Sequence, residues 1–410
     1  MRRVVVTGVG GIAALGASAP ALWSAVARGA CGIRPIAGIA TEGLACRIAA
    51  EIPDFDPALH FTPKQLPMLD RVSQLALVAA REAVQQAAPA GLAALGLPAQ
   101  RSAVVLGAGI GHGTLEHSYR QLYEGDAGQP ARTRLHPFTI PRGMPNAPAS
   151  HLAIEFGIRG PCFATASACA SSSHALGLAF WMIRSGMLDL AVSGGTDASI
   201  CFGYLKGWDA LHVLSNDACR PFSKDRSGLV IGEGAAMLVL EELEHAERRG
   251  ALPLAEIVGC GMSADALDML APSVDGAAAA MQAALDDARL TPEAVNYVNA
   301  HGTATRANDA MEAAALRRVF GAHLDNLPVS STKSMLGHCL GAAGAVEALV
   351  TVQALRDGLL PPTIGFRAPD PDCALDVVPH EARRATIDVA LSNSFAFGGL
   401  NVALLLRRAP

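Results

Sequence analysis

Short apolar runs that end in glycine or serine recur along the chain, and they constrain its fold more than any other feature. In the first half such runs lie at residues 4–8, 103–107 and 190–194, and helical patterns such as residues 72–87 lie between them. Runs of this kind are typical of strands buried on both faces of a mainly parallel sheet. The sequence therefore predicts an α/β fold, in which ligands bind at the carboxyl ends of the strands.

The second half repeats this alternation of strands and helices. We expect strands at residues 255–259, 295–299, 328–331 and 389–392, and helices at residues 276–290 and from Thr291 and Pro292 onward. A charged helix over residues 241–250, which ends in glycine, marks the expected boundary. Because 410 residues exceed one ordinary domain, we expect two similar α/β halves with layered, mainly parallel or mixed sheets, residues 1–250 and 251–410.

Composition argues against several classes of protein. Hydrophobic residues make up 51% of the chain and charged residues 17%, which is typical of a large globular core. The net charge of −5 and the aromatic content of 5% argue against a nucleic-acid partner. No apolar run predicts a membrane span or a signal peptide. Nine scattered cysteines without a C-x-x-C pair indicate a reduced, cytoplasmic protein.

The stretch from residue 160 to residue 178 carries the first candidate functional group. It reads GPCFATASACASSSHALGL and predicts a sharp turn into a helix, with Cys169 at or just before the first helical turn. A helix N-terminus favours an anion, so it would lower the pKa of a thiol placed there. Cys169 is therefore either a nucleophile or, like most free cysteines, an inert buried side chain. Cys162, in the apolar lead-in, is expected to be inert.

Two polar stretches in the second half carry further candidates. His301 lies in NAHGTAT, just after a predicted strand, and the helix that follows it carries Glu312. Lys333 and His338 lie in the glycine-rich stretch STKSMLGHCLGAAG, and the long helix after it carries Glu347. Histidines on strand-to-loop turns with small neighbours are open to a ligand.

A third polar turn, NSFAFGGLN at residues 393–401, follows the last predicted strand and can present a backbone amide to an oxyanion. Each of these features also has an ordinary structural explanation, since most single histidines and glycine-rich turns have no catalytic role. The glycines are not a phosphate loop, because no Lys-Ser or Lys-Thr follows them. A zinc site at Cys169, His301 and His338 is disfavoured, because no pair has the close spacing of metal ligands. We therefore expect no metal.

The ordered set of a cysteine in a small-residue turn, NAHGT, STKSMLGH and NSFAFGG closely resembles the β-ketoacyl-acyl-carrier-protein synthases, the condensing enzymes of the thiolase superfamily. The resemblance covers essentially the whole chain, including RPFSKDR at residues 220–226 and GEGA at residues 232–235. Both histidine positions are filled, as in the elongating Cys-His-His type. The form SACA, with His174 soon after it, is more similar to nodulation-type and polyene-type synthases.

The resemblance implies a thiolase-like fold and an acyltransferase. Such an enzyme takes an acyl group from an acyl carrier protein as a thioester and joins it to malonyl-acyl carrier protein with loss of carbon dioxide, giving a 3-oxoacyl-acyl carrier protein. The pathway would be fatty acid or polyketide and polyene biosynthesis. The resemblance also implies no cofactor, an acyl carrier protein as partner, and a homodimer or a heterodimer with a related subunit.

The resemblance further implies roles for the candidate residues. Cys169 would carry the acyl group, and His301 and His338 would hold the malonyl carbonyl oxygen as it becomes negative. The backbone amides of Cys169 and Phe397 would hold the oxyanion of the acyl thioester. In the family, the Phe397 position also gates access to the cysteine, and the Ile110 position bounds the acyl tunnel.

Three further expectations concern charge. Lys333 would support the site, and a buried lysine needs an acidic partner, for which Glu347 matches the family position better than Glu312. A basic patch near the tunnel mouth would bind the acidic carrier, although each of its members alone is as readily an ordinary solvated charge. The candidates for this patch are Lys64 and Arg134, which fall near positions the family uses, and Arg71, Arg132 and Lys206.

The sequence also departs from the family pattern, and two rival functions remain to be weighed. Ala396 replaces a glycine in the gating turn and Leu400 replaces a threonine after it, which leaves the chemistry intact but puts the chain-length preference in doubt. A thiolase acting on coenzyme A esters would need a second catalytic cysteine near the C-terminus, but the last cysteine, Cys373, lies outside any glycine-rich turn. A non-catalytic chain-length-factor subunit would lack the nucleophile, and Cys169 is present.

Overall fold

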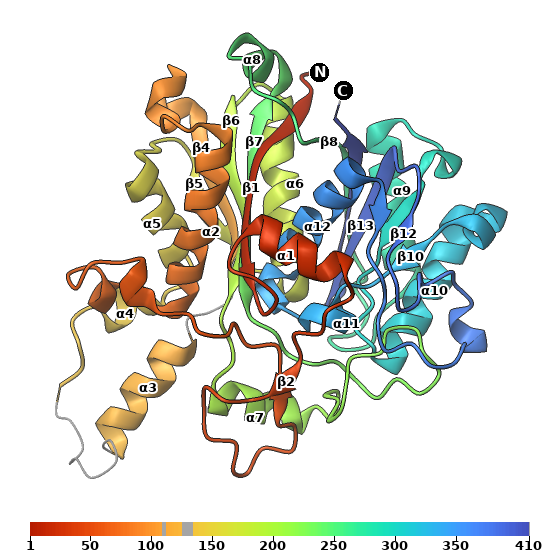
Figure 1. Ribbon diagram of the computed structural model, residues 1–410, viewed down its shortest axis with the longest axis horizontal. Coiled ribbons are helices and arrows are strands. Elements are labelled where there is room, and N and C mark those ends of the chain that lie inside the picture. Colours follow the sequence, from red (N-terminus) through yellow and green to blue (C-terminus); the bar gives the residue numbers. More distant parts are fainter. Residues whose placement is uncertain (109–111, 125–133, 410) are drawn as a thin grey trace.

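A ten-stranded sheet runs through the protein in the computed structural model, which describes residues 1–108, 112–124 and 134–409 (Figure 1). The strand pairs near both ends of the sheet are parallel, and the pairs between them are antiparallel. The sheet is therefore mixed rather than mainly parallel. Its strands, in order across the sheet, are β10 (Val329–Ser330), β9 (Tyr297–Asn299), β13 (Val389–Ala396), β14 (Leu400–Arg408), β8 (Ala255–Ala264), β1 (Val4–Ala13), β7 (Gly234–Glu242), β6 (Leu190–Asp197), β4 (Ser102–Ala108) and β5 (Cys162–Thr165).

The two halves of the sheet, which meet at β1 and β8, repeat one pattern from this junction outward. From β1 the order is β7, β6, β4 and β5, and from β8 it is β14, β13, β9 and β10. In each series the first two pairs are antiparallel and the next two are parallel. The same connectivity thus occurs twice in one chain.

Glycines explain why β1 and β8 each pack closely on a helix. A Cβ atom on Gly10 of β1 would lie 2.0 Å from the carbonyl oxygen of Ala79 in α2 (Arg71–Ala87). A Cβ atom on Gly261 of β8 would lie 2.0 Å from the carbonyl oxygen of Ala280 in α9 (Val274–Ala288). Both contacts need a residue without a side chain, so this strand-on-helix packing is repeated as well.

Helices cover the outer faces of the sheet and fill the space between its two halves (Figure 1). On one outer face α2 lies beside α5 (Ala147–Phe156), and on the other α9 lies beside α10 (Arg306–Phe320). Between the two halves lie α6 (Ser171–Arg184) and α12 (Ala343–Asp357), and each of these helices contacts strands of both halves. The remaining helices are α1 (Ala19–Ala27), α3 (His112–Tyr123), α4 (Thr139–Gly143), α7 (Phe202–Ala210), α8 (Leu243–Arg248) and α11 (Lys333–Leu336).

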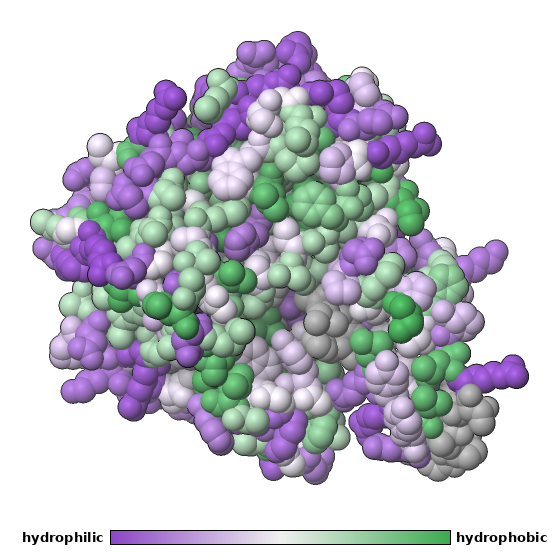
Figure 2. Space-filling view, turned by 180° about the vertical axis from the view of Figure 1, so that it is seen from behind, coloured by the Kyte–Doolittle hydropathy of each residue, from purple (hydrophilic) through white to green (hydrophobic). Residues whose placement is uncertain are grey.

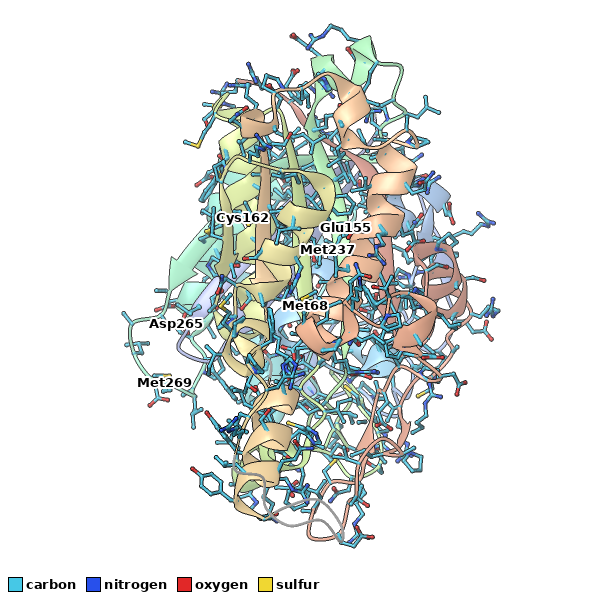
Figure 3. The ribbon with its side chains drawn as sticks, turned by 90° about the vertical axis from the view of Figure 1, so that its left-hand side faces the viewer. Met68, Glu155, Cys162, Met237, Asp265 and Met269 are labelled. Atoms are coloured by element: carbon cyan, nitrogen blue, oxygen red, sulfur yellow. The ribbon has the colours of Figure 1, made fainter. Side chains whose placement is uncertain are left out.

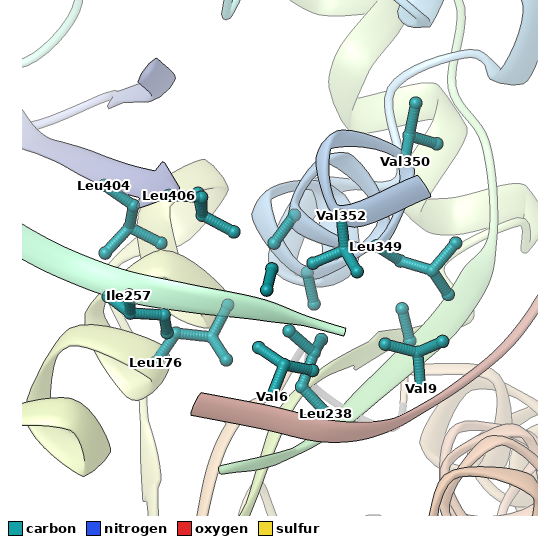
Figure 4. Packing of buried hydrophobic residues seen from close by; sticks show 14 of the residues in the cluster. Val6, Val9, Leu176, Leu238, Ile257, Leu349, Val350, Val352, Leu404 and Leu406 are labelled. Atoms are coloured by element: carbon teal, nitrogen blue, oxygen red, sulfur yellow. The ribbon is translucent and has the colours of Figure 1, made fainter. Parts of the chain in front are cut away.

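The central core packs around α12. Its residues from Ala343 to Leu355 are all buried, as expected for a helix that is enclosed on every side. Figure 4 shows Leu349 and Val352 of this helix in one cluster with Val6 and Leu238 from one half of the sheet and with Leu404 and Leu406 from the other. Both halves of the sheet therefore share one hydrophobic core, to which α12 and α6 contribute.

Two predicted helices differ from the structure. The helix expected from Thr291 is only a 3-10 turn, Pro292–Ala294. The helix expected over residues 241–250 is shorter, because β7 continues to Glu242 and α8 begins at Leu243. The strand continues because the buried Glu241 carboxylate pairs with Arg249 and accepts a hydrogen bond from it, which makes its burial tolerable.

Short sheets and the surface complete the fold. β2 (Arg34–Pro35) pairs with β3 (Ile48–Ala49), and β11 (Leu359–Leu360) pairs with β12 (Arg383–Arg384). On the face opposite to the view of Figure 1, apolar side chains gather over the middle and hydrophilic ones along much of the rim (Figure 2). No helix in the described ranges combines the length and apolar character that crossing a membrane requires.

Candidate active site

Cys169 lies in a tight 3-10 turn, Ala168–Ala170, between β5 and the start of α6. The residue before it, Ala168, has a φ of +47°, in the left-handed region that residues with a Cβ atom rarely adopt. Ser171 holds this turn: its hydroxyl donates to the carbonyl of Ala168 at 2.7 Å and accepts from the backbone N–H of Ser167 at 2.9 Å. Strain of this kind is characteristic of functional turns, and here it points a thiol out of a sharp elbow.

The loop after β9 carries His301, and Glu312 of α10 holds this loop in place. The Glu312 carboxylate accepts the backbone N–H groups of His301 and Gly302, both at 2.8 Å. The side-chain amide of Asn393 donates to the same carboxylate at 3.2 Å. Burial raises the pKa of Glu312 to about 7, whereas these donors lower it. Glu312 therefore positions the His301 backbone and does not contact Lys333.

Lys333 begins α11 and is only 2% exposed. Its ammonium forms a buried ion pair with Glu347 of α12, and lies 3.4 Å from Nδ1 of His301. Burial raises the pKa of Glu347, and the Lys333 charge lowers it. Of the two acidic partners considered from the sequence, Glu347 is the one that the structure pairs with Lys333.

The structure brings Cys169, His301 and His338 together from three separate segments. The thiol sulfur and one ring nitrogen of each histidine lie within 4.8 Å of one another. The two imidazoles meet edge to face, with ring centroids 5.3 Å apart. All three side chains line one pocket, and all three are buried. The convergence predicted for these residues is therefore present.

Hydrogen bonds indicate which ring nitrogen carries the proton in each histidine. The ammonium of Lys333 can only donate, so Nδ1 of His301 accepts from it and Nε2 carries the hydrogen. Nδ1 of His338 accepts the backbone N–H of Leu340 at 3.3 Å, so its Nε2 also carries the hydrogen. Within the described part of the chain, Nε2 of His338 is buried and has no hydrogen-bond partner. It is a donor that is ready for a ligand.

Burial sets the charge of these groups. It lowers the pKa of His301 and of His338 well below the usual value, and the Lys333 charge acts in the same direction. Both imidazoles are therefore neutral near neutral pH. Burial raises the pKa of Cys169 to about 12, although Lys333 opposes this. The sequence predicted a lowered thiol pKa from the helix start alone; loss of solvation outweighs that effect here.

We expect Lys333→Met to move the pH profile of Cys169 alkylation by iodoacetamide to higher pH. Lys333 is the strongest influence that lowers the thiol pKa, so its loss leaves less thiolate at any given pH below that pKa. A rise of one unit in the thiol pKa slows alkylation about ten-fold at a fixed pH. Lys224→Met, which removes an exposed cation, should leave the profile unchanged. An unchanged profile for Lys333→Met would remove Lys333 from the account of thiol reactivity.

The same three side chains form a potential set of metal ligands, which their sequence spacing had argued against. The positive charge of Lys333 beside His301 opposes a second cation at this position. The chemistry of the set is that of a nucleophile with two neutral hydrogen-bond donors.

Phe397 lies on the wall of the pocket in the turn between β13 and β14. The ring of Trp208, from α7, stacks on it with centroids 5.8 Å apart. Among the described residues, the Phe397 N–H donates to no backbone carbonyl. The other residues that line the pocket are Leu211, Val213, Leu229, Met269, Leu270, Ala271, Pro272, Thr303, Thr305, Ala307, Asn308, Phe395, Ala396, Gly399 and Asn401.

A loop at residues 265–272 is tied to the Phe397 turn. The carbonyl of Met269 accepts the N–H of Gly398, and the carbonyl of Gly399 accepts the N–H of Asp265, both at 2.8 Å. Asp265 and Met269 lie on this loop at the edge of the molecule (Figure 3). The side chain of Met269 is largely exposed although it lines the pocket, so the loop forms part of the rim.

Four basic candidates from the sequence do not line the pocket, and two further candidates lie outside the described residues. Ile110 and Arg132 lie outside the described residues. Lys64 and Arg134 are exposed and do not line the pocket. Arg71 is paired with Glu233 through two hydrogen bonds, and the exposed Lys206 donates to the carbonyl of Gly43. Trp208 was missed, because no local motif marks it.

Comparisons with known proteins agree with this geometry. Residues 1–246 match the family model described as beta-ketoacyl synthase, N-terminal domain, and residues 254–367 match the corresponding C-terminal domain. The chain is 47% identical to nodulation protein E of Rhizobium sp. (strain N33) over 408 residues, with 99% of each chain covered. It is 42% identical to 3-oxoacyl-[acyl-carrier-protein] synthase 2 of Coxiella burnetii, again with 99% of each covered.

A solved structure confirms the predicted thiolase-like fold class. The ishigamide ketosynthase/chain length factor superposes with a TM-score of 0.90 at 37% sequence identity, and the match covers all of both chains. The mixed sheet and the central helices described above are thus shared with that structure.

Proposed function

Because the chain belongs to the β-ketoacyl synthase family, we propose that its pocket joins an acyl group held on Cys169 to a malonyl group held on an acyl carrier protein. The chain is a condensing enzyme of the acyltransferase type. The proposal concerns the roles of its residues, its substrates and its partners. The observation that carries it is the convergence of one thiol and two neutral imidazoles in one pocket.

The proposed reaction has three steps. The Cys169 sulfur attacks the acyl thioester carbonyl, and the carrier thiol leaves with the proton. The malonyl thioester then loses carbon dioxide, and its electron pair forms an enolate whose oxygen accepts hydrogen bonds from Nε2 of His301 and Nε2 of His338. The enolate carbon attacks the acyl-Cys169 carbonyl, and the Cys169 sulfur leaves as a thiolate as the 3-oxoacyl product forms. The thiolate then takes up a proton from solvent, which restores the thiol.

The remaining site residues support these steps. The backbone N–H groups of Cys169 and Phe397 stabilise the oxyanion of the first and third steps. Lys333 keeps the His301 proton on Nε2, and Glu347 compensates the buried ammonium. Glu312 holds the backbone of His301 and is a positioning residue.

Incubation of the protein with a panel of acyl carriers and malonyl carrier tests this function. We expect a mass increase on Cys169 with acyl carrier alone, and 3-oxoacyl carrier with release of carbon dioxide when malonyl carrier is added. The control replaces malonyl carrier with acetyl-coenzyme A, which a thiolase would accept as the second substrate. Condensation of acetyl-coenzyme A without decarboxylation would contradict the proposal, as would a protein that condenses nothing with any carrier.

The two rival functions are less well supported. Apart from Cys169, no cysteine among the described residues lines the pocket, whereas a thiolase needs a second one there. A chain-length factor is not favoured, because the nucleophile, both histidines and Lys333 are all in place.

The organisation of the protein and its partners belong to the same proposal. The repeated strand order supports two halves, residues 1–250 with Cys169 and residues 251–410 with the histidines. The partner is an acyl carrier protein, a term that the name of the Coxiella burnetii relative includes, and Lys64 and Arg134 remain weak candidates for contacting it.

The apolar area ringed by hydrophilic side chains supports a homodimer or a heterodimer with a related subunit (Figure 2). Nine free cysteines support a cytoplasmic location. The names of the relatives support a fatty acid or polyketide pathway.

A further inference from the structure

One buried carboxylate near Cys169 has no role in the steps described above. Asp197, at the carboxyl end of β6, is only 2% exposed. It accepts hydrogen bonds from the hydroxyl of Ser199 and, at 3.0 Å, from the backbone N–H of Gly341. Burial raises the pKa of Asp197 to about 6, whereas these hydrogen bonds lower it, so the group is largely ionised at neutral pH. Because a buried charge needs its donors, Asp197 holds the segment of Gly341 in place.

This segment is the short 3-10 turn Leu340–Ala342, which joins the loop of His338 to α12. Leu340 adopts a φ of +45°, in the left-handed region that is unfavourable for a residue with a Cβ atom. Such a conformation persists only where neighbouring contacts hold it. The N–H of Gly341 lies in the peptide group that follows Leu340, so its bond to Asp197 is a contact of this kind.

The same turn decides which nitrogen of His338 carries the hydrogen. The backbone N–H of Leu340 donates to Nδ1 of His338, which leaves the hydrogen on Nε2, the atom without a hydrogen-bond partner in the described chain. The backbone of His338 is fixed by a separate hydrogen bond, from its N–H to the carbonyl of Val230 at 2.7 Å. The turn therefore sets the tautomer of the ring, through the direction of the Leu340 N–H.

We propose that Asp197 is a positioning residue that keeps the hydrogen of His338 on Nε2 by holding the turn of Leu340 and Gly341. This inference rests on the proposed role of His338 in stabilising the enolate. Without the carboxylate, the N–H of Gly341 loses its partner and Leu340 leaves the left-handed region. The N–H of Leu340 then turns away from Nδ1, and both ring nitrogens share the hydrogen. The fraction of protein with a donor at Nε2 falls.

Replacement of Asp197 by residues with and without a hydrogen-bond acceptor tests this role. We expect Asp197→Ala to slow decarboxylation of malonyl carrier about two- to ten-fold, the effect of one lost hydrogen bond. Asp197→Asn keeps a side-chain oxygen that accepts the N–H of Gly341 and should retain most of the wild-type rate. Asp287→Ala is the matched control, because Asp287 accepts the backbone N–H of Cys260, also at 3.0 Å, and does not line the pocket.

Acylation of Cys169 separates this role from a general loosening of the fold. Burial is the main cause of the raised pKa of Cys169, and the negative charge of Asp197 adds to it. Removal of this charge favours the thiolate. We therefore expect Asp197→Ala to acylate Cys169 at least as fast as the wild type while it decarboxylates malonyl carrier more slowly. A loosened fold would slow both reactions.

Nuclear magnetic resonance of protein labelled with ¹⁵N-histidine gives a readout that does not depend on catalysis. A ring nitrogen that carries a hydrogen and one that does not differ clearly in chemical shift, and the signals of His338 are those lost in His338→Ala. We expect the hydrogen on Nε2 in the wild type, Asp197→Asn and Asp287→Ala, and shared between the two nitrogens in Asp197→Ala.

The outcomes separate this inference from the function on which it rests. An Asp197→Ala protein that keeps the hydrogen on Nε2, or that slows acylation and decarboxylation equally, overturns the role of Asp197 alone. A hydrogen on Nδ1 of His338 in the wild type, a result that needs no variant, overturns it as well. A wild-type protein that neither acylates Cys169 nor decarboxylates malonyl carrier overturns the proposed function, whatever the tautomer of His338.

Discussion

We expect the Cys169→Ala protein to take up no acyl group from an acyl carrier protein and its rate of condensation to fall about 10⁴-fold or more. The sulfur is the atom that forms and breaks the bond to the acyl group, and alanine has no atom that can replace it. Alanine occupies less space than cysteine in a turn whose neighbours are already small, so the elbow held by Ser171 is retained. Intact-protein mass spectrometry and the yield of 3-oxoacyl carrier measure both effects.

A matched replacement elsewhere on the chain controls for the general loss of a thiol. Cys162 lies on strand β5, is exposed and does not line the pocket. Cys162→Ala should be acylated and should condense as the wild type does. An acyl adduct on the Cys169→Ala protein, or its absence from the Cys162→Ala protein, would show that the nucleophile has been assigned to the wrong cysteine.

We expect the His338→Ala protein to decarboxylate malonyl carrier about 10²- to 10³-fold more slowly than the wild type, although Cys169 should still be acylated. The buried Nε2–H of His338 has no partner in the described protein, so its hydrogen bond forms only with substrate and strengthens as the enolate develops. His301→Ala should lose a similar factor, because its Nε2–H faces the same pocket. Release of carbon dioxide from labelled malonyl carrier measures this step alone.

Two further variants sharpen this result. His338→Asn keeps a side-chain N–H donor and should retain more decarboxylation than His338→Ala. His117 is exposed and does not line the pocket, so His117→Ala should behave as the wild type. A His338→Ala protein that releases carbon dioxide at the normal rate would exclude His338 from enolate stabilisation.

The position of the site within the fold followed from strand patterns. Cys169 comes after β5, His301 after β9, Lys333 after β10 and Phe397 after β13. Apolar runs followed by polar or small residues predicted β9, β10 and β13 with functional groups at their carboxyl ends. β5 was predicted only as an apolar lead-in to the turn of Cys169. β9, β10 and β13 belong to one repeat of the sheet, and β5 belongs to the other, where it takes the outermost place that β10 has in its own.

The electrostatics of the site were not predictable in the same way. The turn before α6 indicated a lowered pKa for Cys169, but the effect of burial is larger and has the opposite sign. Burial depends on which segments surround the thiol, including the loop of His338 and the turn of Phe397. The choice of Glu347 rather than Glu312 as the partner of Lys333 also depends on how α12 packs beside α11.

By itself the sequence determined the alternation of strands and helices, the duplication of that pattern and the turns that carry Cys169, His301 and His338. These features depend on the periodicity and conformational preferences of neighbouring residues. Only the tertiary structure decided the antiparallel centre of the sheet, the ion pair of Lys333 and the stack of Trp208 on Phe397. Each of these is a contact between segments that are remote in sequence, so its free energy appears only when the chain is folded.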